Sequence, residues 1–150
     1  LDAAAAEGKV NLGAQQTATW DEAEAKKIVE SVINAGDSFN VIYAENDGMA
    51  KGAVAALDEA GITHGVDGDV IVMGFDCNKW ALRELLAGNW NYDGQCSPFQ
   101  AEVIDGMIKT LEEGGEIEGL NEAGQIINEE RGFDAKEITE EDIETYGLGE

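Results

Sequence analysis

Side chains suited to binding a small polar ligand occur where predicted strands end. One such residue follows or closes each of four predicted strands: Trp20, Asn46, Asp76 and Gln95. Indole offers a flat apolar face, while amides and carboxylates offer donors and acceptors in forked pairs. A polyhydroxylated ligand needs both, because its C–H face stacks on a ring and its vicinal hydroxyls require forked partners. The pattern therefore predicts a site for a small sugar-like molecule.

Each of these residues also has a purely structural interpretation. Asp47 is a typical N-cap for the helix that follows it, since Asp is favoured at that position. Asp76 could cap the next helix in the same way. Trp20 could act as a hydrophobic staple onto its own helix. We expect Trp80 and Trp90 to pack in the core or at its edge.

Other site chemistries receive little support from the sequence. His64 is the single histidine and has no obvious Ser or Cys partner, so we expect it at the surface rather than in a triad. The two cysteines, Cys77 and Cys96, are too few for a zinc site. Neither a P-loop nor a G-x-G-x-x-G pattern occurs, and nucleotide binding therefore lacks its usual loop. We predict no cofactor, no metal and no enzymatic activity.

The residues that position these side chains alternate between strand and helix patterns. Strands are predicted over 10–16, 39–45, 70–75, 89–96 and 124–130, the third a continuous apolar run typical of a strand buried on both faces. Helices are predicted over 20–36, 47–60, 79–88, 97–114 and 138–147. Such alternation predicts an α/β fold, a three-layer αβα sandwich with a mainly parallel, Rossmann-like sheet. In such sheets ligands bind beyond the carboxyl ends of the strands.

Charge and hydropathy narrow the functional classes. Nine Lys and Arg face 32 Asp and Glu over 150 residues, giving a net charge of −23. Such a field repels phosphate backbones and anionic lipids, so we expect no nucleic-acid binding by this segment. No apolar run approaches the ~20 residues of a membrane span.

The first residues read as the end of a helix closed by Gly8, which predicts that the chain is a fragment.

Three stretches carry a resemblance to a known family. "AENDGMAKGAVAAL" from Ala44, "VIVMGFD" from Val70 and the strand ending in Gln95 resemble the C-terminal lobe of type I periplasmic sugar-binding proteins, the ribose- and galactose-binding type. "TATWDEAEAKK" from Thr17 resembles the family's strand-to-helix joint with an aromatic. The same lobe is shared by effector domains of lac-repressor-type regulators. The resemblance covers about Val10 to Ile127.

The resemblance implies a function and roles for the four residues. Trp20 would stack on the sugar ring, Asn46 and Asp76 would hydrogen-bond its hydroxyls, and Gln95 would bind near the hinge. The whole protein would be the solute-binding component of a carbohydrate ABC importer, acting outside the cytoplasm and meeting the transporter permease. Cys77 and Cys96 depart from the family pattern and leave the fine specificity open.

Two alternatives to an importer component remain open from the residues alone. The first is the effector-sensing domain of a lac-repressor-type regulator, which an upstream helix-turn-helix would reveal. The second, a Rossmann-type enzyme, has no catalytic constellation to support it.

Two further expectations follow from the family's layout. Cys77 and Cys96 would border one cleft, where a disulfide could join them. The segment 97–124 would belong to the other lobe, and its helix carries an apolar stripe: Phe99, Val103, Ile104, Met107, Ile108 and Leu111. In this chain alone we expect that helix either to fold onto its own sheet or to be covered by a second copy of the chain.

Overall fold

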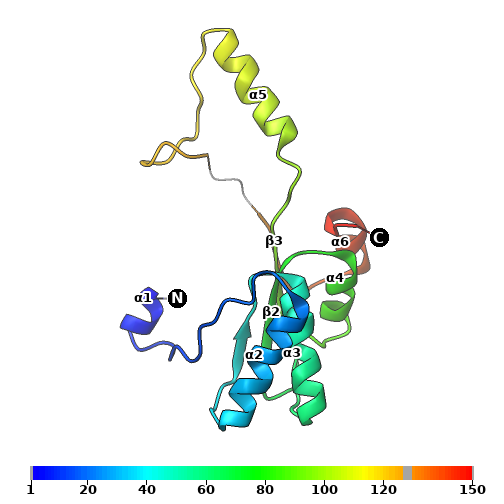
Figure 1. Cartoon of the computed structure of the whole chain (residues 1–150). Helices are drawn as coiled ribbons and strands as arrows, with labels where there is room; N and C mark the ends of the chain where they lie inside the picture. The colour runs from blue at the N-terminus through cyan, green and yellow to red at the C-terminus, as the bar shows by residue number, and fades with distance from the viewer. Residues whose placement is uncertain (1, 127–129, 150) are drawn as a thin grey trace.

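Helices and strands alternate through most of the computed structural model, which describes residues 2–126 and 130–149 (Figure 1). In chain order the elements are α1 (Asp2–Ala6), α2 (Glu22–Ala35), β1 (Val41–Tyr43), α3 (Asp47–Ala60), β2 (Ile71–Asp76), α4 (Lys79–Leu86), β3 (Tyr92–Gln95), α5 (Ala101–Glu112), β4 (Gly132–Asp134) and α6 (Glu140–Tyr146).

The described strands form one sheet in the order β1-β2-β3-β4. β1, β2 and β3 run parallel, and β4 is antiparallel to β3. Each parallel connection passes through a helix, α3 between β1 and β2 and α4 between β2 and β3. The predicted α/β class with a mainly parallel sheet is confirmed.

The helices begin and end at the expected signals, with one exchange of roles. Asp21 caps α2 by accepting the Glu24 N–H at 2.8 Å, and Thr139 forms a capping box with Asp142 on α6. At α3 the cap is Asn46, whose Oδ1 accepts the Met49 N–H at 2.7 Å. The expectation that Asp47 caps this helix was wrong, because Asp47 is the first helical residue and turns its side chain inward.

The core lies between the sheet and the helices on one of its faces. Val72 from β2, Leu57 from α3, Leu82 and Leu85 from α4 and Trp90 before β3 are all at most 1% exposed. Trp80 packs edge-on against Trp90 with ring centroids 6.0 Å apart, which confirms the packing role expected for both. α2 forms a second layer on α3, and a Cβ at Gly52 would lie 2.0 Å from the Glu22 carbonyl oxygen. Only glycine allows that close approach.

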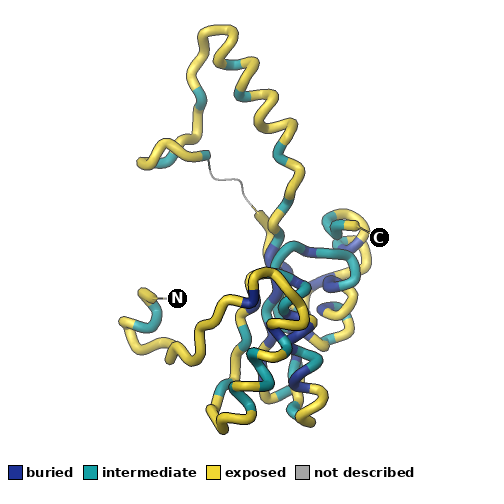
Figure 2. Tube along the Cα trace, viewed as in Figure 1, coloured by how far each residue is buried: buried dark blue, intermediate teal, exposed yellow. Residues whose placement is uncertain are grey.

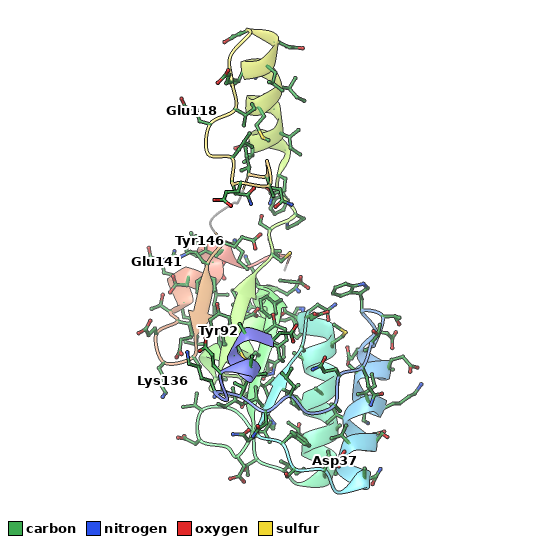
Figure 3. The ribbon with its side chains drawn as sticks, turned by 90° about the vertical axis from the view of Figure 1, so that its left-hand side faces the viewer. Asp37, Tyr92, Glu118, Lys136, Glu141 and Tyr146 are labelled. Atoms are coloured by element: carbon green, nitrogen blue, oxygen red, sulfur yellow. The ribbon has the colours of Figure 1, made fainter. Side chains whose placement is uncertain are left out.

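The opposite face of the sheet is largely uncovered in this chain. Val41, Tyr43 and Ile71, which neighbour one another in the β1–β2 register, are 41–45% exposed. Figure 3 shows the side chains as sticks, seen from the side of the molecule on which α1 lies in Figure 1. The expectation that 70–75 is buried on both faces was wrong, since burial alternates along β2.

Two other predicted elements differ from the structure, and a third lies partly outside the described residues. Residues 10–16 form no strand and are exposed, because their backbone pairs with no neighbouring strand. The helix predicted from Ser97 begins at Ala101; Ser97 Oγ accepts the Phe99 N–H at 3.3 Å in a turn before it. The predicted strand 124–130 falls partly on 127–129, outside the described residues. The strand β4, just beyond it, was not predicted.

α5 projects away from the body of the molecule together with the chain that follows it (Figures 1 and 2). None of its residues is buried, and four of its apolar side chains are 41–59% exposed: Val103, Ile104, Ile108 and Leu111. Of the two outcomes expected for this helix, folding back onto its own sheet is not seen, and cover by a second copy of the chain stays a prediction. No described helix is both long and apolar enough to cross a bilayer.

Candidate functional site

Asp76 and Gln95 lie side by side at the carboxyl edge of the sheet. Asp76 is the last residue of β2, Gln95 is the last residue of β3, and the two are register partners. Asn46 lies at the same edge, in the short link between β1 and α3. The structure thus brings three predicted site residues from three neighbouring strand ends to one place.

An open hollow of about 340 Å³ lies at this edge. Trp20 and Gln95 line it, together with Tyr43, Glu45, Phe75, Cys96 and Glu130. Asn46 and Asp76 do not line it, although each directly follows a lining residue, Glu45 and Phe75. Trp20 is 67% exposed, which leaves its ring free for a ligand to stack on.

Sequence reasoning missed the aromatic floor of the hollow. Tyr43 and Phe75 meet in a tilted pair with ring centroids 5.2 Å apart. Gly94 makes room for them, because a Cβ there would lie 2.5 Å from the Phe75 ring. Both rings belong to the uncovered face of the sheet. Their positions one or three residues before the predicted polar groups are the signal that could have identified them.

Backbone strain is concentrated at the same edge. Among the described residues, four that are not glycine have positive φ: Thr19 (50°), Trp20 (64°), Asp76 (121°) and Cys77 (61°). Residues other than glycine rarely adopt such angles, and they persist only where surrounding contacts impose them. Two predicted ligand residues therefore lie in strained turns, as is typical of binding sites.

Asn46 and Gln95 each use one end of the amide to fix their own position. Asn46 Oδ1 caps α3, and the remaining Nδ2 is the group suited to donate to a hydroxyl. Gln95 Oε1 accepts the Arg131 N–H at 3.4 Å, and the Gln95 N–H donates to the Arg131 carbonyl at 2.7 Å. Each amide is held at its oxygen, and within residues 2–126 and 130–149 no hydrogen bond of either NH₂ group is seen, so both groups are suited to a ligand.

Two fully buried carboxyl groups lie directly behind the Asp76 turn. Asp47 and Asp93 are both 0% exposed. Asp47 Oδ2 accepts from the Asn78 backbone N–H at 2.8 Å and from Asn78 Nδ2 at 2.9 Å. The Cys77 thiol donates to Asp93 Oδ1 at 3.8 Å. Asp47 therefore connects α3 to the start of α4.

Burial sets the ionisation of these acids. Desolvation, followed by the charge of Asp47, raises the pKa of Asp93 to about 9. Desolvation also raises the pKa of Asp47, but hydrogen bonds from Asn78 oppose that rise. The pKa of Asp76 is raised by partial burial and lowered by the backbone N–H of Asp47. Burial, together with the nearby carboxylates, strongly raises the pKa of the Cys77 thiol.

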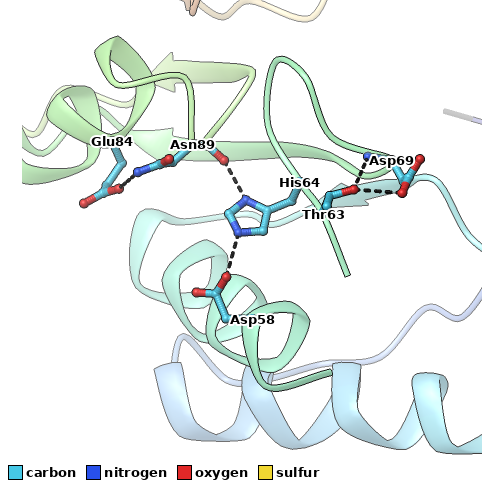
Figure 4. Close-up of polar contacts among 6 residues, drawn as sticks. All are labelled: Asp58, Thr63, His64, Asp69, Glu84 and Asn89. Carbon is cyan, nitrogen blue, oxygen red and sulfur yellow. Dashed lines mark hydrogen bonds and ion pairs between the residues drawn. The ribbon is translucent and has the colours of Figure 1, made fainter. Parts of the chain in front are cut away.

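The two cysteines, His64 and the possibility of a metal site complete the candidates from the sequence. Cys77 is buried and Cys96 exposed, and both are free thiols, so the possible disulfide is absent. His64 is only 12% exposed and contacts Asp58 and the Asn89 carbonyl near the amino end of β2 (Figure 4), so the expectation of a surface histidine was wrong. Within residues 2–126 and 130–149, no cluster of three His, Cys, Asp or Glu residues could hold a metal ion.

Comparison with known proteins identifies the family. The family model described as periplasmic binding protein domain matches residues 1–95. The chain belongs to the periplasmic binding protein family. A D-apiose import binding protein of Actinobacillus succinogenes is 40% identical over 80 residues, 53% of this chain and 24% of the relative. A fructose import binding protein of Bifidobacterium longum is 30% identical over 127 residues, 83% of this chain and 36% of the relative.

Solved structures show the same fold. A galactofuranose binding protein aligns with a TM-score of 0.74 at 22% identity, covering 97% of this chain and 48% of that one. A periplasmic solute binding protein from Actinobacillus succinogenes with bound D-allose aligns with a TM-score of 0.73 at 24% identity, covering 97% of this chain and 47% of that one. This periplasmic binding protein chain thus spans about half the length of those structures and a smaller share of the curated relatives.

Proposed function

We propose that this chain is the C-terminal lobe of a type I sugar-binding protein that delivers a monosaccharide to an ABC importer. The proposal rests most directly on the register pairing of Asp76 with Gln95 at the carboxyl edge, beside Asn46 and the hollow that Trp20 lines. The relatives named as apiose and fructose import binding proteins support the same ligand class. The protein would act outside the cytoplasm, without catalysis, and dock on the transporter permease.

In this account each side chain has one task at the ligand. The Trp20 indole stacks on the C–H face of the sugar ring, where aromatic rings bind apolar patches. The Asp76 carboxylate accepts from hydroxyls, and the amide NH₂ groups of Asn46 and Gln95 donate to others. The strained turns that carry Trp20 and Asp76 hold these groups in place before the sugar arrives, which lowers the entropic cost of binding.

The segment 97–124 belongs to the second lobe in this proposal. The absence of any buried residue on α5, beside an apolar stripe that includes Ile104, Ile108 and Leu111, supports this assignment. The sugar would then bind between two lobes that close around it by a hinge motion. The hollow seen here would be one half of that cleft.

A thermal-shift screen tests the proposal on the native protein that carries this lobe with its partner lobe. A ligand that binds only the folded state raises the melting temperature in proportion to RT ln(1 + [L]/Kd). We expect one or a few furanose or pyranose monosaccharides to stabilise the protein, and sugar phosphates to fail because the acidic site repels them. Stabilisation by no neutral sugar, together with a shift by a cation or nucleotide, would contradict it.

A further inference from the structure

The buried acids Asp47 and Asp93 have no role among the sugar contacts described above. Each is fully buried, and each has one oxygen, Asp47 Oδ1 or Asp93 Oδ2, that accepts no hydrogen bond from the part of the chain that the structure describes. Leaving a buried acceptor unpaired is costly, and two bare carboxylates buried side by side would cost more. The two groups therefore need a further link between them.

The sheet brings the two carboxyl groups together. Asp93 is the register partner of Gly74, and a Cβ on Gly74 would lie 2.8 Å from Asp47 Oδ1. Gly74 therefore leaves the space in which the Asp47 side chain reaches the position beside Asp93. No basic side chain is recorded in contact with either acid among the described residues. A single proton is the simplest link that satisfies both oxygens.

The same pair supports the turn that presents Asp76 to the ligand. Asp47 holds Asn78 by two hydrogen bonds, and Asp93 receives the Cys77 thiol. Asp76 and Cys77, immediately before Asn78, are the residues at φ 121° and 61°. Contacts from both acids thus hold the residues that follow Asp76.

We propose that Asp47 and Asp93 are positioning residues of the sugar site: they share one proton, and the joined pair holds the strained Asp76–Asn78 turn in its ligand-binding shape. The inference rests on the proposed function for its consequence at the ligand, whereas the shared proton itself does not. The protonated Asp93 donates to Asp47 Oδ1, and Asp47 stays ionised to accept from Asn78. The raised pKa of Asp93 agrees with this assignment.

The groups around the Asp47–Asp93 pair determine what happens when the pair loses its proton. Asp76 faces it from the end of β2 and adds to the repulsion that a second charge would meet, whereas the neutral Cys77 thiol donates a hydrogen bond to Asp93. Phe133 from β4 pairs with Asp93 in the sheet, and Asn78 faces Asp47 from the start of α4. Neither carries a charge. Above the pKa of Asp93, two ionised carboxylates would separate and release the turn.

Carboxyl-carbon NMR of the aspartates in the 16.0 kDa chain tests the shared proton without any ligand. We expect one aspartate to titrate near pH 9, several units above the others, and its signal to vanish in Asp93→Asn. The exposed Asp37→Asn variant should leave that titration in place. Titration of every aspartate below pH 6 would overturn the pair.

Amide hydrogen exchange at Asn78 tests the positioning role. Asp93→Asn keeps a donor toward Asp47 and an acceptor for the Cys77 thiol, so it should keep Asn78 protected and extend that protection above pH 9. Asp47→Ala removes both acceptors for Asn78 and should speed exchange at that amide at least about tenfold. If Asp47→Ala does not fold, the comparison of Asp93→Asn with the wild type across pH still decides. Equal alkaline loss of protection in both proteins would overturn the role.

Sugar affinity of the native protein, measured across pH, tests whether the Asp47–Asp93 pair affects ligand binding. We expect the affinity of the wild type to fall as pH rises past 9, and that of Asp93→Asn to stay level. A parallel fall in both would overturn the effect on the ligand. A sugar panel with no binder would overturn the proposed function instead, while the carboxyl titration would still decide whether the proton is shared.

Discussion

At the residue scale, Asn46 combines two tasks that a substitution can separate. Its Oδ1 caps α3, whereas its Nδ2 is the group we assign to the sugar. Asp is as good an N-cap as Asn but lacks the NH₂ donor. We predict that Asn46→Asp keeps the free energy of unfolding within about 0.5 kcal/mol of the wild type and weakens sugar binding by roughly tenfold or more.

Denaturant unfolding and calorimetry measure the two effects of that substitution. Asn46→Ala serves as the matched control, because it removes both the cap and the donor and should cost stability as well, by about 1 kcal/mol. Unchanged affinity in Asn46→Asp would remove Asn46 from the site.

The buried acid pair also predicts how stability depends on pH. The pKa of Asp93 is 3.8 in the unfolded reference and about 9 in the fold, so the folded chain binds more protons than the unfolded chain between these values. Stability therefore falls as pH rises through that window. Asp93→Asn removes this contribution, and its melting temperature should exceed that of the wild type at pH 8 by more than at pH 5. An equal difference at both pH values would contradict the prediction.

Gly74 is the residue that makes room for this arrangement. A Cβ there would lie 2.8 Å from both Asp47 Oδ1 and the Trp90 ring. Overpacking of this kind typically costs about 1–3 kcal/mol. We predict that Gly74→Ala lowers stability by that amount in urea unfolding, whereas Gly106→Ala on exposed α5, where a Cβ meets nothing within 4 Å, does not lower it. Equal stabilities would contradict the close packing.

At the element scale, local signals predicted the helices better than the strands. Helix caps act between residues a few positions apart and can therefore be recognised in the sequence. The caps at Asp21, Gly36, Gly61 and Thr139 are examples. A strand needs a neighbouring strand to pair with, and local sequence does not show which segment that will be. Residues 10–16 have a strand-like composition but form no strand. Three strand ends and their polar residues were predictable, but the Asp47–Asp93 pair was not, because it depends on the register of β2 with β3.

The helix α5 packs against no other described element, and its apolar side chains are exposed. Burying an apolar side chain stabilises by roughly 1.5–3 kcal/mol, so its exposed stripe favours association. We predict a concentration-dependent dimer of the 150-residue chain in analytical ultracentrifugation. Ile104→Lys with Ile108→Lys should abolish it, whereas Glu112→Lys on the same helix should not. A monomer at every concentration would contradict the prediction.

At the scale of the whole molecule, the proposed function treats this chain as one lobe of a two-lobe site. The chain covers 48% of the galactofuranose binding structure, and its hollow is open to solvent. In the proposed function a second lobe closes over the sugar and adds contacts that the 150-residue chain alone would not supply. We therefore predict that it binds sugar far more weakly than the native protein does, as measured by titration calorimetry. Micromolar binding by the isolated chain would contradict the two-lobe account.

The central claim is that Asp76 binds a monosaccharide at the carboxyl edge of this sheet. Titration calorimetry of the native protein with the sugar found by thermal shift tests it most directly, with Asp76→Ala beside the exposed Asp37→Ala. Losing a hydrogen bond to a charged group costs about 1.5–3 kcal/mol, so Asp76→Ala should weaken binding by roughly one to two powers of ten. Asp37→Ala should match the wild type. Equal affinity of the wild type and Asp76→Ala would contradict the account.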